Sequence, residues 1–170
     1  MLFVSSPERL EYRWLGYGRD PPAHFSEGNG PAVQWNGHAP VVLLVEDDTV
    51  DIMAVERALR RVKPAASVHV AHDGAQGLAI LKGVTGEEPV PFPDLVLLDL
   101  QMPRMGGLEF LEALRASSDP SLRDLPVVVL THSDLDEDRR AADALGVTGF
   151  ITKTTDTQRL ADILDWLLSR

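Results

Sequence analysis

The sequence contains no cysteine, which excludes disulfide bonds, thiolate catalysis and metal sites built on cysteine. Positive charge is scarce: 16 Lys and Arg face 26 Asp and Glu, so the net charge is −10. This balance argues against direct binding to nucleic acid, which needs clustered Lys and Arg to neutralise phosphates. No apolar run is long enough to span a bilayer, and the N-terminus lacks the basic start of a signal peptide. We therefore expect a cytoplasmic protein with neither a membrane nor a nucleic-acid partner.

The chain divides by composition into two parts. Residues 1–40 are dense in Gly and Pro and show no sustained helical or strand period, although aromatic residues are scattered among them. This leader is expected to be flexible, or to be an interaction arm that packs on its own domain or on a second copy. Residues 41–170 carry regular apolar patterns and are expected to form one domain.

Strand and helix patterns alternate five times in that domain. Apolar runs of strand length occur at 41–45, 67–71, 95–98, 126–130 and 148–151, and each is followed by a segment with helical spacing. Such alternation predicts an α/β fold with right-handed crossovers and a doubly wound, five-stranded parallel sheet. The strand order 2-1-3-4-5 suits five strands, and it places ligands at the carboxyl ends of the first and third strands.

Acidic residues follow these two neighbouring strands. The run 95–98 ends on Asp99, and the first strand is followed by Glu46, Asp47 and Asp48. Asp48 is explained as the cap of a helix N-terminus, but capping does not explain Glu46, Asp47 and Asp99 together. Because clustered carboxylates repel one another, we expect a cation among them, and oxygen ligands without His or Cys favour Mg²⁺.

Two further polar residues end strands at the same edge. Thr131 follows the fourth strand and Lys153 follows the fifth. A hydroxyl and an ammonium beside the carboxylates suit phosphoryl transfer, in which Asp99 is the nucleophile, Mg²⁺ and Lys153 neutralise the transferring oxygens, and Thr131 donates a hydrogen bond.

These motifs resemble the two-component response regulator receiver domain, the CheY-like, flavodoxin-like family. The segments that carry the resemblance are Val45-Glu46-Asp47-Asp48, Leu98-Asp99-Leu100-Gln101-Met102-Pro103 with Gly106-Gly107, Leu130-Thr131 and Phe150-Ile151-Thr152-Lys153. The loop 85–93 further resembles single-domain regulators that are paired with bacterial phytochrome histidine kinases. The resemblance implies that Asp99 accepts a phosphoryl group from a phosphohistidine of a partner histidine kinase.

The resemblance also implies the other roles in the site. Asp47, Asp99 and the backbone carbonyl of Gln101 would bind Mg²⁺, and Glu46 would hold a coordinating water. Lys153 would pair with the phosphoryl group, and Thr131 would move toward it together with the aromatic switch residue Phe150.

Four positions depart from the family pattern or leave two interpretations open. Phe150 stands where many relatives have Tyr, and Thr154 stands where many have Pro, so a cis peptide after Lys153 would be costly. His132 either shades the phosphoryl group from water or points to solvent. Trp166 is either exposed beside the apolar stripe of the last helix, a dimer surface in many receivers, or a half-buried core residue.

The expected function is a phosphoacceptor switch rather than an independent enzyme, because the protein catalyses only its own phosphorylation and dephosphorylation. Nothing after Arg170 would form an effector domain, so the output is expected to be a changed protein-interaction surface. The expected face comprises the helix 135–145, the strand 148–151 and the last helix, and it is a possible homodimer surface. The alternative is a phosphorylation-independent docking module with a receiver fold. An aspartyl phosphatase usually has a second acid where this chain has Gln101, and a dinucleotide enzyme would need a glycine-rich loop.

Overall fold

The computed structural model describes residues 25–33, 37–84, 89–132 and 136–169. Part of the loop 85–93 and most of the leader lie outside this description. No helix within the described ranges has the length and apolar character needed to cross a membrane. The elements are β1 (Phe25–Glu27), β2 (Val41–Val45), α2 (Thr49–Val62), β3 (Ser67–Ala71), α3 (Gly74–Leu81), β4 (Leu95–Asp99), α4 (Gly107–Arg115), α5 (Pro120–Arg123), β5 (Val127–Thr131), α6 (Asp136–Ala144), β6 (Gly149–Thr152) and α7 (Thr157–Leu167).

The strands form one sheet in the order β1-β6-β5-β4-β2-β3. The five strands from β2 to β6 are parallel, which confirms the predicted sheet and its order 2-1-3-4-5. The sixth strand, β1, pairs antiparallel with β6 and was not predicted. Three residues from a segment rich in Gly and Pro carry too little pattern to be recognised as a strand.

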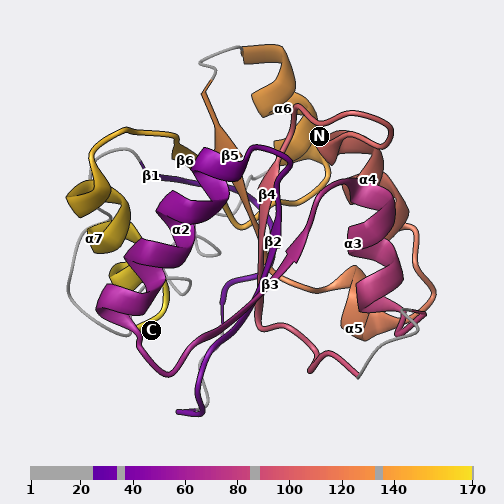
Figure 1. The fold of residues 1–170 in the computed structure, drawn as a ribbon. Coiled ribbons are helices and arrows are strands. Elements are labelled where there is room, and N and C mark those ends of the chain that lie inside the picture. Colours follow the sequence, from indigo (N-terminus) through magenta and orange to yellow (C-terminus); the bar gives the residue numbers. More distant parts are fainter. Residues whose placement is uncertain (1–24, 34–36, 85–88, 133–135, 170) are drawn as a thin grey trace, which may run out of the picture.

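Helices cover both faces of the sheet (Figure 1). Helices α2 and α7 pack together on one face, and α3, α4 and α5 lie on the other. The central strands are therefore buried on both sides, and all five residues of β4 and of β5 are inaccessible or nearly so. This explains why the strands read as unbroken apolar runs. It also explains why the polar residues at their carboxyl ends stand out.

Residues 25–31 lie along the outer edge of β6. The Phe25 ring contacts Trp166 of α7, with centroids 4.9 Å apart and planes tilted by 53°. The Asn29 side chain donates a hydrogen bond of 2.7 Å to Asp143, and the Thr148 hydroxyl donates one to the Pro31 carbonyl. Trp166 is only 8% exposed, so the interpretation that left it at the surface is wrong.

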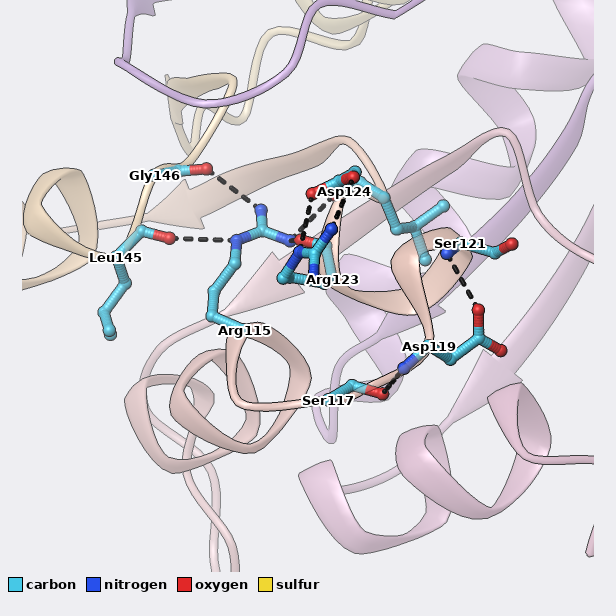
Figure 2. Close-up of polar contacts among 9 residues, drawn as sticks. Arg115, Ser117, Asp119, Ser121, Arg123, Asp124, Leu145 and Gly146 are labelled. Atoms are coloured by element: carbon cyan, nitrogen blue, oxygen red, sulfur yellow. Dashed lines mark hydrogen bonds and ion pairs between the residues drawn. The ribbon is translucent and has the colours of Figure 1, made fainter.

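A half-buried guanidinium joins the elements that follow α4 (Figure 2). Arg115, the last residue of α4, donates hydrogen bonds to four backbone carbonyls and to no side chain among the described contacts. These carbonyls belong to Arg123 and Leu125 at the end of α5 and to Leu145 and Gly146 after α6. One planar side chain thus joins the end of α4 to two connections, α5–β5 and α6–β6.

Candidate functional site

The parallel register brings the predicted site residues to one edge. Val45 pairs with Leu98, so the acids after β2 lie beside Asp99 at the end of β4. On the other side of β4, Thr131 lies one residue beyond the partner of Asp99 and pairs with Thr152, next to Lys153. These strand ends surround a cavity of about 250 Å³ lined by Glu46, Asp47, Asp48, Asp51, Asp99, Gln101, Thr131, His132 and Lys153.

Three carboxylates in this cavity have the arrangement of a cation site. One oxygen each of Glu46, Asp47 and Asp99 lies within 4.8 Å of the others. Burial raises the pKa of Glu46 and of Asp99 above their ordinary values, although Lys153 opposes both shifts. The buried Glu46 Oε2 has no hydrogen-bond donor among the described residues. A hard divalent cation would relieve the repulsion and would suit these oxygen donors.

Lys153 lies among carboxylates from three elements. Its Nζ atom is 2.7 Å from Glu46 Oε2, 2.8 Å from Asp51 Oδ2 and 3.5 Å from Asp99 Oδ1. The side chain is 9% exposed. Burial lowers the pKa of Lys153, but the hydrogen bond with Asp51, the ion pair with Glu46 and the charge of Asp99 outweigh burial and raise it. The ammonium is therefore charged at neutral pH and lies beside the group it was predicted to assist.

Thr131 and Phe150 lie at different depths. Thr131 is 8% exposed, lines the cavity, and accepts a hydrogen bond of 2.7 Å from the Lys153 backbone through its own carbonyl. Phe150 is buried in the core on the α3–α4 side of the sheet, and the Arg139 guanidinium lies 4.7 Å from its ring centroid. Phe150 is thus one layer removed from the cavity, where a packing change could reach it but a ligand would not touch it.

Several residues around the site stabilise the local backbone. Asp48 caps α2 by accepting hydrogen bonds from the Val50 and Asp51 amides, as its position predicted. Glycine is needed at position 107 because a β carbon there would collide with the Asp99 carbonyl. The loop between Asp99 and Gly107 contains Arg104 in a left-handed conformation (φ 65°), and the Arg104 side chain pairs with Asp73. The cap fixes the loop that follows β2, and the glycine and the ion pair fix the loop that follows Asp99.

The structure bears on two of the open interpretations, the direction of His132 and the peptide bond after Lys153. His132 is 71% exposed, yet its Nε2 atom lies 3.5 Å from Asp51 Oδ2, so it is neither buried over Asp99 nor directed wholly to solvent. All peptide bonds of the described residues are trans, including the bond after Lys153, in keeping with Thr154 in place of proline.

Asp51 and the Asp73–Arg104 pair were not predicted from the sequence. Asp51 lies in the first turn of α2, where an acid is explained by the helix dipole alone, so its direction toward Lys153 gave no separate signal. Asp73 and Arg104 are 31 residues apart, and only the fold brings them together.

Comparisons with known proteins identify similar sequences and structures. The family model of the response regulator receiver domain matches residues 42–165. Response regulator Rcp1 of Synechocystis sp. is 34% identical over 120 residues, which are 71% of this chain and 80% of Rcp1. The crystal structure of the phosphorylated cyanobacterial phytochrome response regulator RcpA is similar with a TM-score of 0.68 at 32% identity, covering 76% of this chain and 91% of RcpA. The crystal structure of the Mn²⁺-bound form of response regulator Rcp1 is similar with a TM-score of 0.66 at 32% identity, covering 77% of this chain and 96% of Rcp1.

Proposed function

The chain belongs to the response regulator receiver domain family, and from this premise we propose that Asp99 accepts a phosphoryl group from a partner histidine kinase. The observation that carries the proposal is the shared cavity of Asp99, Asp47, Glu46, Thr131 and Lys153. An aspartate nucleophile, an acidic cluster and an ammonium within 3.5 Å of that nucleophile are what phosphoryl transfer to a carboxylate requires.

In the proposed reaction an Asp99 carboxylate oxygen attacks phosphorus as the phosphorus–nitrogen bond of the phosphohistidine breaks. Asp47, Asp99 and the Gln101 carbonyl would hold Mg²⁺, with Glu46 acting through a water, and the bound ion would supply positive charge for the transferring oxygens. Its fit rests on the three clustered carboxylates and on the buried Glu46 oxygen that lacks a hydrogen-bond donor. Lys153 pairs with the transferred group, and Thr131 donates a hydrogen bond to it.

The proposed output is a change in protein contacts, because the protein catalyses only its own phosphorylation and dephosphorylation. Movement of Thr131 toward the phosphoryl group would let the Phe150 ring repack, and the α6–β6–α7 face would change with it. The edge of β6 already carries β1 of the same chain. A homodimer through this face would therefore have to use the flanking helices or displace β1.

The proposed partner is a histidine kinase of the bacterial phytochrome type. RcpA, at 32% identity, is itself a phytochrome response regulator, and its likeness to this chain supports the choice. Such a kinase would meet the regulator in the cytoplasm, where we propose that the protein works.

Incubation with Mg²⁺ and acetyl phosphate, followed by intact mass measurement, tests the proposal. The wild type should gain one phosphoryl group that is stable in acid and labile in base, and Asp99→Asn should gain none. The matched control is Asp162→Asn, an exposed position on α7, which should behave as the wild type. A wild type that gains nothing would indicate a docking module, and one that releases phosphate without accumulating the adduct would indicate a phosphatase.

A further inference from the structure

Asp51 contacts Lys153 more favourably than the predicted phosphoacceptor does. Lys153 Nζ donates a hydrogen bond of 2.8 Å to Asp51 Oδ2, whereas its distance to Asp99 Oδ1 is 3.5 Å. The contact of 2.7 Å with Glu46 Oε2 is an ion pair that lacks hydrogen-bond geometry. Among the carboxylates of the site, Asp51 is therefore the one that accepts a described hydrogen bond from the ammonium, while Glu46 contributes a close ion pair.

The Asp51 carboxylate is itself held in place. It projects from the first turn of α2, whose N-terminus is fixed by the Asp48 cap. The same Oδ2 atom lies 3.5 Å from His132 Nε2, at the end of β5. Asp51 thus connects α2 with the ends of β5 and β6, and its side chain is 26% exposed while that of Lys153 is 9% exposed. A partner on a capped helix is more rigid than one on a loop.

We propose that Asp51 is a positioning residue that retains Lys153 in the unphosphorylated protein and competes with the phosphoryl group for its ammonium. This inference rests on the proposed function, because it assigns a cost to the step in which Lys153 turns to the modified Asp99. A ligand shifts an equilibrium only by its differential contacts in the two states, and in this proposal Lys153 gives up its hydrogen bond with Asp51 when it turns to the phosphoryl group. Asp51 would accordingly set how readily the site accepts and holds a phosphoryl group.

The test uses beryllofluoride, a noncovalent mimic of the phosphoryl group, titrated calorimetrically into the full chain in excess Mg²⁺. Asp51→Asn should raise the affinity about fivefold, because it removes a partly exposed ion pair that competes for Lys153. Asp51→Glu keeps a carboxylate on the same helix turn and should stay near the wild-type value.

The matched control is Asp48→Asn, which removes one charge from the same cavity lining. Asparagine is also a good N-cap, so α2 is preserved, and the Asp48 side chain accepts its described hydrogen bonds from the backbone amides of Val50 and Asp51. Asp48→Asn should change the affinity less than twofold. Mg²⁺ affinity measured without beryllofluoride should fall similarly in both variants, since each removes one nearby negative charge.

The outcomes separate the two proposals. A wild type that binds no beryllofluoride in Mg²⁺ would overturn the phosphoacceptor function and the role of Asp51 together. A wild type that binds it, with Asp51→Asn equal to the wild type or to Asp48→Asn, would overturn the positioning role alone. A larger gain for Asp51→Asn than for Asp48→Asn, reversed in Asp51→Glu, would support it.

Discussion

Two cations, the largely buried Lys153 and the half-buried Arg115, lie in different parts of this molecule and differ in the groups that they contact. Lys153 at the carboxyl edge of the sheet contacts the carboxylates of Glu46, Asp51 and Asp99. Arg115 contacts only neutral carbonyls among its described hydrogen bonds (Figure 2). Burial lowers the pKa of Arg115, whereas the acidic neighbours of Lys153 outweigh burial and raise its pKa.

The difference separates a movable charge from a fixed one. A guanidinium is planar and stays charged, so four carbonyls at matching angles hold it in one orientation. An ammonium has three rotatable donors and no directional fork, so its position follows whichever nearby group is most negative. A phosphoryl group on Asp99 would change that balance at Lys153, and no comparable change is available at Arg115. We therefore expect Arg115 to contribute mainly to stability and Lys153 mainly to response.

The largest expected effect tests the fixed cation. Arg115→Ala leaves four carbonyls, three of them in half-buried hydrogen bonds, without their donor and should lower the free energy of unfolding by about 3 kcal/mol. Urea unfolding would measure the loss, and Arg60→Ala, at a position 73% exposed in an i,i+4 pair, should cost less than about 0.5 kcal/mol. The folded fraction of Arg115→Ala should still be phosphorylated by acetyl phosphate. Loss of that reaction in folded protein would remove the distinction between the two cations.

Replacing Lys153 is expected to reduce stability less than replacing Arg115 does, but to impair the response to phosphorylation more. Lys153→Ala should remain folded but lose about 2 kcal/mol without divalent cations, because buried carboxylates lose their counter-charge. Mg²⁺ should restore most of this loss by binding the folded state, and it should restore none of the loss in Arg115→Ala. Urea unfolding with EDTA and with Mg²⁺ compares the two variants.

The response of Lys153→Ala is a separate measurement. Phosphorylated variant protein should show no change in hydrogen exchange on the α6–β6–α7 face, since the link from Asp99 to β6 is missing. An exchange difference as large as that of the wild type would contradict the assignment of Lys153 to the response.

The sequence was sufficient for the parallel sheet because each buried strand is an unbroken apolar run between helical patterns. The convergence of Glu46, Asp47 and Asp99 followed from strand order, since the carboxyl ends of neighbouring parallel strands share one edge. Interactions without a local pattern could not be predicted in this way. Strand β1 is recognised only through its pairing with β6, and Arg115 resembles any basic residue in the last turn of a helix.

Side-chain direction was a second limit. Asp48 and Asp51 are both acids near the start of α2, and the sequence alone explains both by the favourable interaction of an acid with a helix N-terminus. In the structure Asp48 turns back to the helix amides, while Asp51 turns outward to Lys153. The sequence therefore predicted that the acids lie at this edge of the sheet, but it did not show which of them contacts Lys153.

The smallest expected effect is a difference in pH dependence between Asp99 and Asp73. Burial raises the pKa of Asp99 above the ordinary aspartate value of about 3.9. At a pH between these two values, Asp99 is protonated in the folded protein and ionised in the unfolded chain. Stability then falls as pH rises through that window. Without divalent cations Asp99→Asn should accordingly be more stable than the wild type at neutral pH, and the gain should vanish in acid.

Asp73 has the opposite sign and makes the control. The hydrogen bond from the Gln76 amide, assisted by Arg104, lowers the pKa of Asp73, so this carboxylate stabilises the folded state above its ordinary pKa. That contribution is lost as pH falls through the lowered value. Asp73→Asn should therefore be less stable than the wild type at neutral pH, with the difference vanishing in acid. Urea unfolding from pH 7 to pH 3 in EDTA would follow both variants, and a shift of the same sign in both would mean that the carboxylate beside Lys153 is as well satisfied as an ordinary helix cap.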